Sequence, residues 1–173
     1  MYGFAGGDPV NFSDPFGLCK NAKGEEVPAG KCRDVTAEEG KKVYDAAVDE
    51  GAWTYTQGRK GEPAKDFCAN KGDCTDFVEA AMRGAGLPEL SPRPATAEYP
   101  GTSYRALGSA DTPRAGDVII VGGHAGVLTG SKHADGTLMA IQNGNSGVKS
   151  MRFKPGVNGL SGTQTIHRRQ VPQ

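Results

Sequence analysis

Two stretches of the chain have the apolar spacing of amphipathic helices. The first helix is expected to begin after Thr36, which has the spacing of a capping box with Glu39, and to end at Gly51. Apolar residues recur along one face of this segment, at Val43, Tyr44, Ala47 and Val48. The pattern predicts that this face packs inward.

The second helix is expected to begin after Asp73, a favourable N-cap residue, and to end in the glycines and proline of residues 84–88. Its apolar residues fall at positions i, i+3, i+4, i+7 and i+8, namely Cys74, Phe77, Val78, Ala81 and Met82. This spacing places Cys74 in the first turn, on the side that faces the core.

The second half of the chain has the features of short strands. Strands are expected at 118–121, 124–129, 138–142 and 148–153, with a further one at 163–167. Asp135-Gly136 marks a hairpin between the second and third of these. Residues 19–35 are predicted to be an N-terminal loop or linker, and 36–173 one folded domain. Helices followed by antiparallel strands indicate an α+β fold.

Composition and charge exclude several classes of function. The 173 residues include 20 basic and 20 acidic side chains, so the formal net charge is zero, which argues against nucleic-acid binding by bulk electrostatics. Only the tail is basic, and we expect its Arg152, Lys154, Arg168 and Arg169 to be solvated. No apolar run approaches the roughly 18 residues of a membrane span, and the N-terminus does not resemble a signal peptide.

The chain contains four cysteines, Cys19, Cys32, Cys68 and Cys74. They do not form the closely spaced pairs typical of zinc sites, so we expect neither a metal nor another cofactor. Cys19 and Cys32 could close a loop through a disulfide in an oxidising compartment. A disulfide between Cys68 and Cys74 would consume the most interesting thiol, so we regard that pairing as an oxidation hazard.

Cys74 and His124 are the candidates for chemistry. A helix N-terminus and a nearby imidazole both favour the thiolate, the reactive form of cysteine. His124 begins a predicted strand between small residues at 122–123 and 125–126, so a helix end could approach it closely. His133, beside a turn, and His167, beside two arginines, are expected to be exposed and not catalytic.

A catalytic histidine works best when a third group fixes its tautomer and orientation. Gln142 and Asn143 both end the neighbouring predicted strand, and alternation along the strand does not choose between them. We prefer Asn143. The backbone amide of Cys74 and the hydroxyl of Tyr55 are candidates to stabilise an oxyanion, although Tyr55 could equally be an aromatic anchor.

Four motifs resemble those of NlpC-type and CHAP-type papain-like cysteine peptidases. They are YTQG (55–58), DCTDFV (73–78) followed by GAGLP (84–88), GDV (116–118) and GHAGV (123–127), in the family's order. The resemblance covers about residues 36–153. It implies a papain-like fold, in which the cysteine helix packs on a small antiparallel sheet that carries the histidine. The chain departs at Asp76, where NlpC-type enzymes have glycine, and at 142–143, which is closer to the CHAP branch.

The first eighteen residues, MYGFAGGDPVNFSDPFGL, resemble the closing motif of Rhs (YD-repeat) carrier proteins. In that family the shell cleaves the chain just after the final leucine and releases a toxin. The resemblance implies that residues 1–18 are a remnant of the carrier, that the toxin begins at Cys19, and that this chain cannot cleave itself. The carrier would then perform the export, by type VI secretion.

Together the two resemblances imply an antibacterial effector that hydrolyses a peptide or amide bond of peptidoglycan stem peptides in the periplasm of the target cell. The alternative is a papain-like toxin that deamidates, acylates or cleaves a protein of the target cell. The implied partners are the Rhs carrier shell and an immunity protein that plugs the cleft. A binding module with a decayed site is a third reading, which the intact Cys74 and His124 disfavour.

Overall fold

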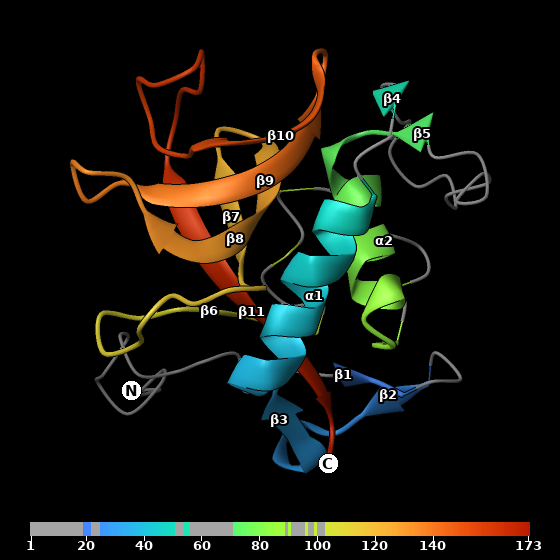
Figure 1. Cartoon of the computed structure of the whole chain (residues 1–173). Coiled ribbons are helices and arrows are strands. Elements are labelled where there is room, and N and C mark those ends of the chain that lie inside the picture. The colour runs from blue at the N-terminus through green and yellow to red at the C-terminus, as the bar shows by residue number, and fades with distance from the viewer. Residues whose placement is uncertain are drawn as a thin grey trace, which may run out of the picture.

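An antiparallel sheet with two helices packed against one face forms the body of the protein (Figure 1). The computed structural model describes residues 19–21, 25–50, 54–55, 71–88, 90, 96, 99 and 103–173. Within these residues seven strands form the main sheet, in the order β10-β9-β8-β7-β11-β3, with β6 also paired to β11. The α+β class expected from the sequence is therefore confirmed.

The elements have the following bounds. The helical segments are η2 (Ala29–Lys31), α1 (Ala37–Asp49) and α2 (Cys74–Gly84). The strands are β1 (Cys19–Lys20), β2 (Glu26–Val27), β3 (Cys32–Asp34), β4 (Thr54–Tyr55), β5 (Lys71–Gly72), β6 (Tyr104–Ala106), β7 (Val118–Val121), β8 (His124–Lys132), β9 (Leu138–Gly144), β10 (Gly147–Arg152) and β11 (Gln164–Pro172).

Helix α1 begins with the predicted capping box. The Thr36 hydroxyl accepts from the Glu39 amide at 3.1 Å, and the Glu39 carboxylate accepts from the Thr36 amide at 2.7 Å. Hydrogen bonding from Arg33 lowers the pKa of Glu39 to about 2 against the opposing effect of burial. Val43 is fully buried, as predicted, whereas Val48 is 47% exposed, so the apolar stripe is narrower than its sequence predicts.

Helix α2 is the more deeply buried of the two helices. The Asp73 side chain accepts from the amides of Thr75 and Asp76, and Asp76 returns a hydrogen bond to the Asp73 amide. Every residue from Cys74 to Met82 is buried. The predicted N-cap and core-facing residues are confirmed, and the helix holds Cys74 at its first position.

Two apolar clusters cover the two faces of the sheet. The larger cluster lies between the sheet and the helices and includes Cys74, Phe77, Ala125 and Val127. The smaller one lies on the other face and consists of Ile119, Val121, Leu128, Ala140 and Phe153. Successive residues of β8 thus face opposite sides, as strand geometry requires.

The segment 19–35 has more structure than the loop expected from the sequence. A disulfide joins Cys19 to Cys32, β1 pairs with β2, and β3 pairs with β11 at the edge of the main sheet. The sequence contains no alternation long enough to reveal these strands of two or three residues. Their pairing depends on partners that are distant in sequence.

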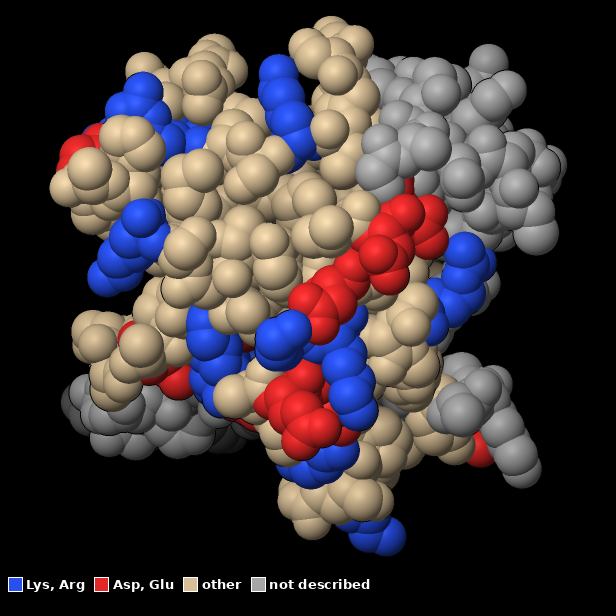
Figure 2. All heavy atoms as spheres, viewed as in Figure 1, with Lys and Arg blue, Asp and Glu red and all other residues tan. Residues whose placement is uncertain are grey.

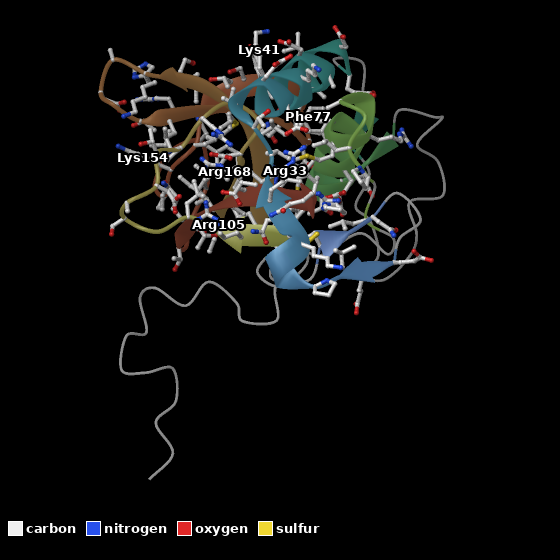
Figure 3. The ribbon with its side chains drawn as sticks, turned by 90° about the horizontal axis from the view of Figure 1, so that it is seen from below. Arg33, Lys41, Phe77, Arg105, Lys154 and Arg168 are labelled. Carbon is white, nitrogen blue, oxygen red and sulfur yellow. A yellow bond between two sulfur atoms is a disulfide. The ribbon has the colours of Figure 1, made fainter. Side chains whose placement is uncertain are left out.

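Arg168 and Arg169 of the basic tail are buried, contrary to the expectation of a solvated surface, whereas the side chains of Arg152 and Lys154 remain 40% and 44% exposed. Arg169 is fully buried, Arg168 is 6% exposed and His167 is 1% exposed, because all three lie in the middle of β11. The Arg168 guanidinium donates to both carboxylate oxygens of Asp117, at 2.9 and 2.8 Å. Figure 3 shows Arg168 beside Arg105, whose own ion pairs complete a charged network there.

Charges on the surface are mixed. On the face shown in Figure 2, acidic and basic side chains lie next to one another along α1, where Lys41 pairs with Asp45 and Lys42 with Glu38. None of the helices in the described part of the chain has the length and apolar character that crossing a bilayer demands.

Candidate functional site

The Cys74 thiol is buried, with 6% of the residue exposed, at the first position of α2. Burial raises its pKa to about 11, and the Asp73 carboxylate adds to this rise. The backbone amides of Ala125, Cys74 and Thr75 oppose the rise, because they point toward the sulphur and favour its anion. At neutral pH the resting side chain is therefore a thiol, and it needs a base to become a nucleophile.

The Ala125 amide locates the sulphur relative to the sheet. The Leu128 amide donates to the Asp117 carbonyl, at the β7 side, at 2.8 Å. Amide directions alternate along a strand, so the Ala125 amide points to the opposite side, toward β9. The first residues that pair between β8 and β9 at this end are Val127 and Ile141. The Cys74 sulphur therefore meets the sheet from the helix side, at the end of β8 where pairing with β9 has not yet begun.

His124 begins β8 after a tight turn at Gly122 and Gly123, whose φ angles of 57° and 86° suit the paired left-handed conformations of a type I′ hairpin. Its imidazole stacks on Phe153, with ring centroids 5.8 Å apart and an interplanar angle of 16°. Its Nε2 atom lies 2.5 Å from the Oε1 atom of Gln142.

The contact with Gln142 defines the tautomer of His124. A carboxamide oxygen only accepts hydrogen bonds, so Nε2 carries the proton and donates it to Gln142. In the neutral form of the ring, Nδ1 is then the nitrogen with the free lone pair. This is the arrangement that a general base requires, with one nitrogen held by a neighbour and the other free to take a proton.

No hydrogen bond joins Cys74 to His124 among the described residues. The sulphur contacts the amide of Ala125, the residue that follows His124. Nδ1 is the ring nitrogen closer to the main chain, while the more distant Nε2 reaches Gln142. The His124 side chain lies on the Phe153 face, so proton transfer requires a movement of the imidazole or of the thiol toward the gap between the strands.

Asn143, which we preferred as the partner of His124, has a different contact. Its Nδ2 atom donates to the Gly72 carbonyl at 2.9 Å, and its side chain is fully buried on the helix side of the sheet. Gly72 directly precedes the N-cap of α2, so Asn143 holds the start of that helix against β9. Gln142, the alternative, is the residue that the structure places on His124.

The structure describes some of the other predicted site residues, and others lie outside the described residues. Tyr55 lies in β4, where its backbone pairs with Gly72, but its side chain lies outside the described residues, as does all of Cys68. His133 is exposed, as expected, and contacts Asp135. His167 is buried, contrary to expectation. Burial lowers its pKa to about 4, and its Nε2 contacts Thr165.

A cavity of about 360 Å³ adjoins His124 on the face of the sheet away from the helices. His124 and Gln142 form part of its wall. The turn between β9 and β10 and the segment 158–161 form much of the remainder, and Lys149 and Met151 of β10 also line it. The sequence patterns did not predict this cavity, because its walls come from segments that meet only in the folded sheet.

No three His, Cys, Asp or Glu side chains within the described ranges gather where they could hold a metal ion. No family model matches the chain, and no curated protein sequence matches it.

Proposed function

We propose that this chain is a cysteine hydrolase of papain-like type that cleaves an amide bond in the stem peptides of bacterial peptidoglycan. Cys74 is the nucleophile, His124 the base and Gln142 the residue that orients His124. The observation that carries the proposal is the place of Cys74 at the N-terminus of α2, with its sulphur against the amide of Ala125, the residue that follows the Gln142-bonded His124. The order of the NlpC-type and CHAP-type motifs supports the choice of substrate class.

The reaction follows from these groups. Nδ1 of His124 takes the thiol proton, and the thiolate attacks the carbonyl carbon of the scissile amide. The amides at the start of α2 stabilise the oxyanion. The carbon–nitrogen bond breaks as His124 gives the proton to the leaving amine, which leaves a thioester on Cys74. Water then attacks the thioester, His124 takes the water proton and returns it to the sulphur, and the acid product leaves.

We further propose that residues 1–18, which lie outside the described residues, belong to the end of an Rhs carrier. The carrier would deliver the domain to the periplasm of a target cell, and an immunity protein would protect the producer. These proposals rest on the sequence resemblance at 9–18.

The test is expression of the full chain in a bacterial host, with and without a periplasmic export signal, beside a Cys74→Ala variant. We expect lysis only with export and only with Cys74 present, and muropeptide analysis of the walls would identify the bond. Reduced protein that leaves purified muropeptides intact would contradict the proposal. Toxicity from the cytoplasm that depends on Cys74 would instead indicate a protein target.

A pair of neighbouring variants separates catalysis from structure. Gln142→Ala removes the partner of His124, and we expect it to lower kcat by roughly tenfold to a hundredfold, more than any loss of stability explains. Asn143→Ala removes the hydrogen bond to Gly72, and we expect it to lower the free energy of unfolding by about 1–3 kcal/mol. Urea denaturation and turnover of the same preparations measure both effects. Equal loss of kcat at equal stability would contradict these roles.

A further inference from the structure

The cavity beside His124 has a distinctive charge pattern. Among the described residues that line it, Lys149 is the only one with a formal charge, and none is Asp or Glu. The remaining polar lining consists of neutral groups, among them the side chains of Asn145, Ser146 and Asn158. Such a cavity favours a ligand that carries a negative charge together with hydrogen-bonding groups.

Lys149 shares a face of the sheet with His124 and Gln142, whereas Cys74 approaches the sheet from the helix side. In the register between β9 and β10, Lys149 lies directly opposite Gln142, and Gln142 contacts His124 on β8. The three side chains therefore form a row across three neighbouring strands. Figure 1 shows that the turn between β9 and β10 and the loop before β11 both rise at the end of the sheet where α2 begins.

Lys149 is available to a ligand. Its side chain is exposed, and it forms no ion pair or hydrogen bond with any described residue. By contrast, Lys41 and Lys154 on the described surface pair with the carboxylates of Asp45 and Asp135. An ammonium group without a partner at the wall of a cavity is suited to bind a carboxylate.

We propose that this cavity is a substrate subsite in which Lys149 binds a free carboxylate of the peptide being cleaved. The inference rests on the proposed function and adds the chemical group that the enzyme selects. Strands lie about 4.8 Å apart, so Lys149 is roughly 10 Å across the sheet from β8. An extended peptide advances about 3.3–3.6 Å per residue, so the selected carboxylate lies within about three residues of the scissile amide.

The test uses two synthetic stem peptides that differ only in one group, a free carboxylate in the first and its carboxamide in the second. We expect the wild-type full chain to cleave the carboxylate peptide with a higher kcat/KM. Lys149→Met should lower that kcat/KM by about tenfold to a hundredfold and leave the carboxamide peptide unaffected. Lys149→Arg should retain most of the preference. Lys132→Met, at an exposed lysine of β8 outside the cavity, is the matched control.

Calorimetric binding to the Cys74→Ala variant distinguishes failure of this inference from failure of the proposed function. Binding of the carboxylate peptide that depends on Lys149, without cleavage by the wild type, would support the subsite and contradict the hydrolase. Cleavage of both peptides at equal rates, or equal effects of Lys149→Met and Lys132→Met, would overturn the subsite and leave the hydrolase standing. Absence of both cleavage and binding would overturn the inference as well.

Discussion

The resting state of Cys74 can be tested directly through its reactivity. With a pKa of about 11, raised by burial, the fraction of thiolate at pH 7 is about one in ten thousand, since the pH lies four units below the pKa. An unperturbed thiol with the reference pKa of 9.0 would be ionised about a hundred times more. Alkylation of Cys74 should therefore be slow at neutral pH and should accelerate about tenfold per pH unit between pH 7 and pH 10.

The assay follows iodoacetamide labelling by intact-protein mass spectrometry. A Cys68→Ser background leaves Cys74 as the only cysteine outside the Cys19–Cys32 disulfide, provided that no reductant is present. The Cys68→Ser/Cys74→Ala double variant gives the blank, and a small thiol such as N-acetylcysteine gives the reference profile in the same buffers.

A plateau of fast labelling that begins below neutral pH would refute this reasoning. Such a profile would mean that Cys74 is already a thiolate, stabilised by a protonated His124 in the resting protein. The buried neutral thiol would then be the wrong description of the resting site. A rise without a plateau up to pH 10 would support a nucleophile that His124 activates only when substrate is bound.

Three further predictions concern stability. Burial lowers the pKa of His167 from 6.5 to about 4, so between these pH values the unfolded chain gains a proton that the folded chain does not. The free energy of unfolding should therefore fall by about 2 kcal/mol from pH 7 to pH 5, as measured by urea titrations at each pH. His167→Gln should make this pH dependence smaller. Thr36→Ala should lower the free energy of unfolding by about 1 kcal/mol, and an unchanged urea midpoint would contradict the role of the capping box. Asp117→Asn should lower the free energy of unfolding by about 3–5 kcal/mol, because Arg168 stays buried without its carboxylate. The double replacement Asp117→Leu/Arg168→Met should lower it much less, and calorimetry measures both.

Local signals made the helices and the central strands predictable. The capping residues Thr36 and Asp73 bond to amides within three positions along the chain, so their roles can be read from neighbouring residues alone. The edge of the sheet could not be predicted in this way. Strand β3 pairs with β11 across more than a hundred residues, and nothing near Cys32 or Asp34 indicates that partner.

The candidate site shows the same division. The position of Cys74 at a helix start and that of His124 at a strand start follow from local patterns, and the structure places both as predicted. The choice between Gln142 and Asn143 depends on which face of β9 turns toward the helices, and α2 decides that by packing on the side of Asn143. The burial of His167 depends similarly on β11 being an inner strand rather than an edge.

Strand β11 is the last strand of the chain, and it is also the strand that joins the others: it pairs with β7 and β6 and carries β3 at its far end. During synthesis, β7 to β10 can pair with one another before β11 exists, but β3 and β6 have no place in the sheet until β11 arrives. The complete sheet therefore forms only after residues 164–172 have been synthesised. A premature stop before residue 164 would leave every residue of the proposed site encoded and yet prevent the sheet from closing.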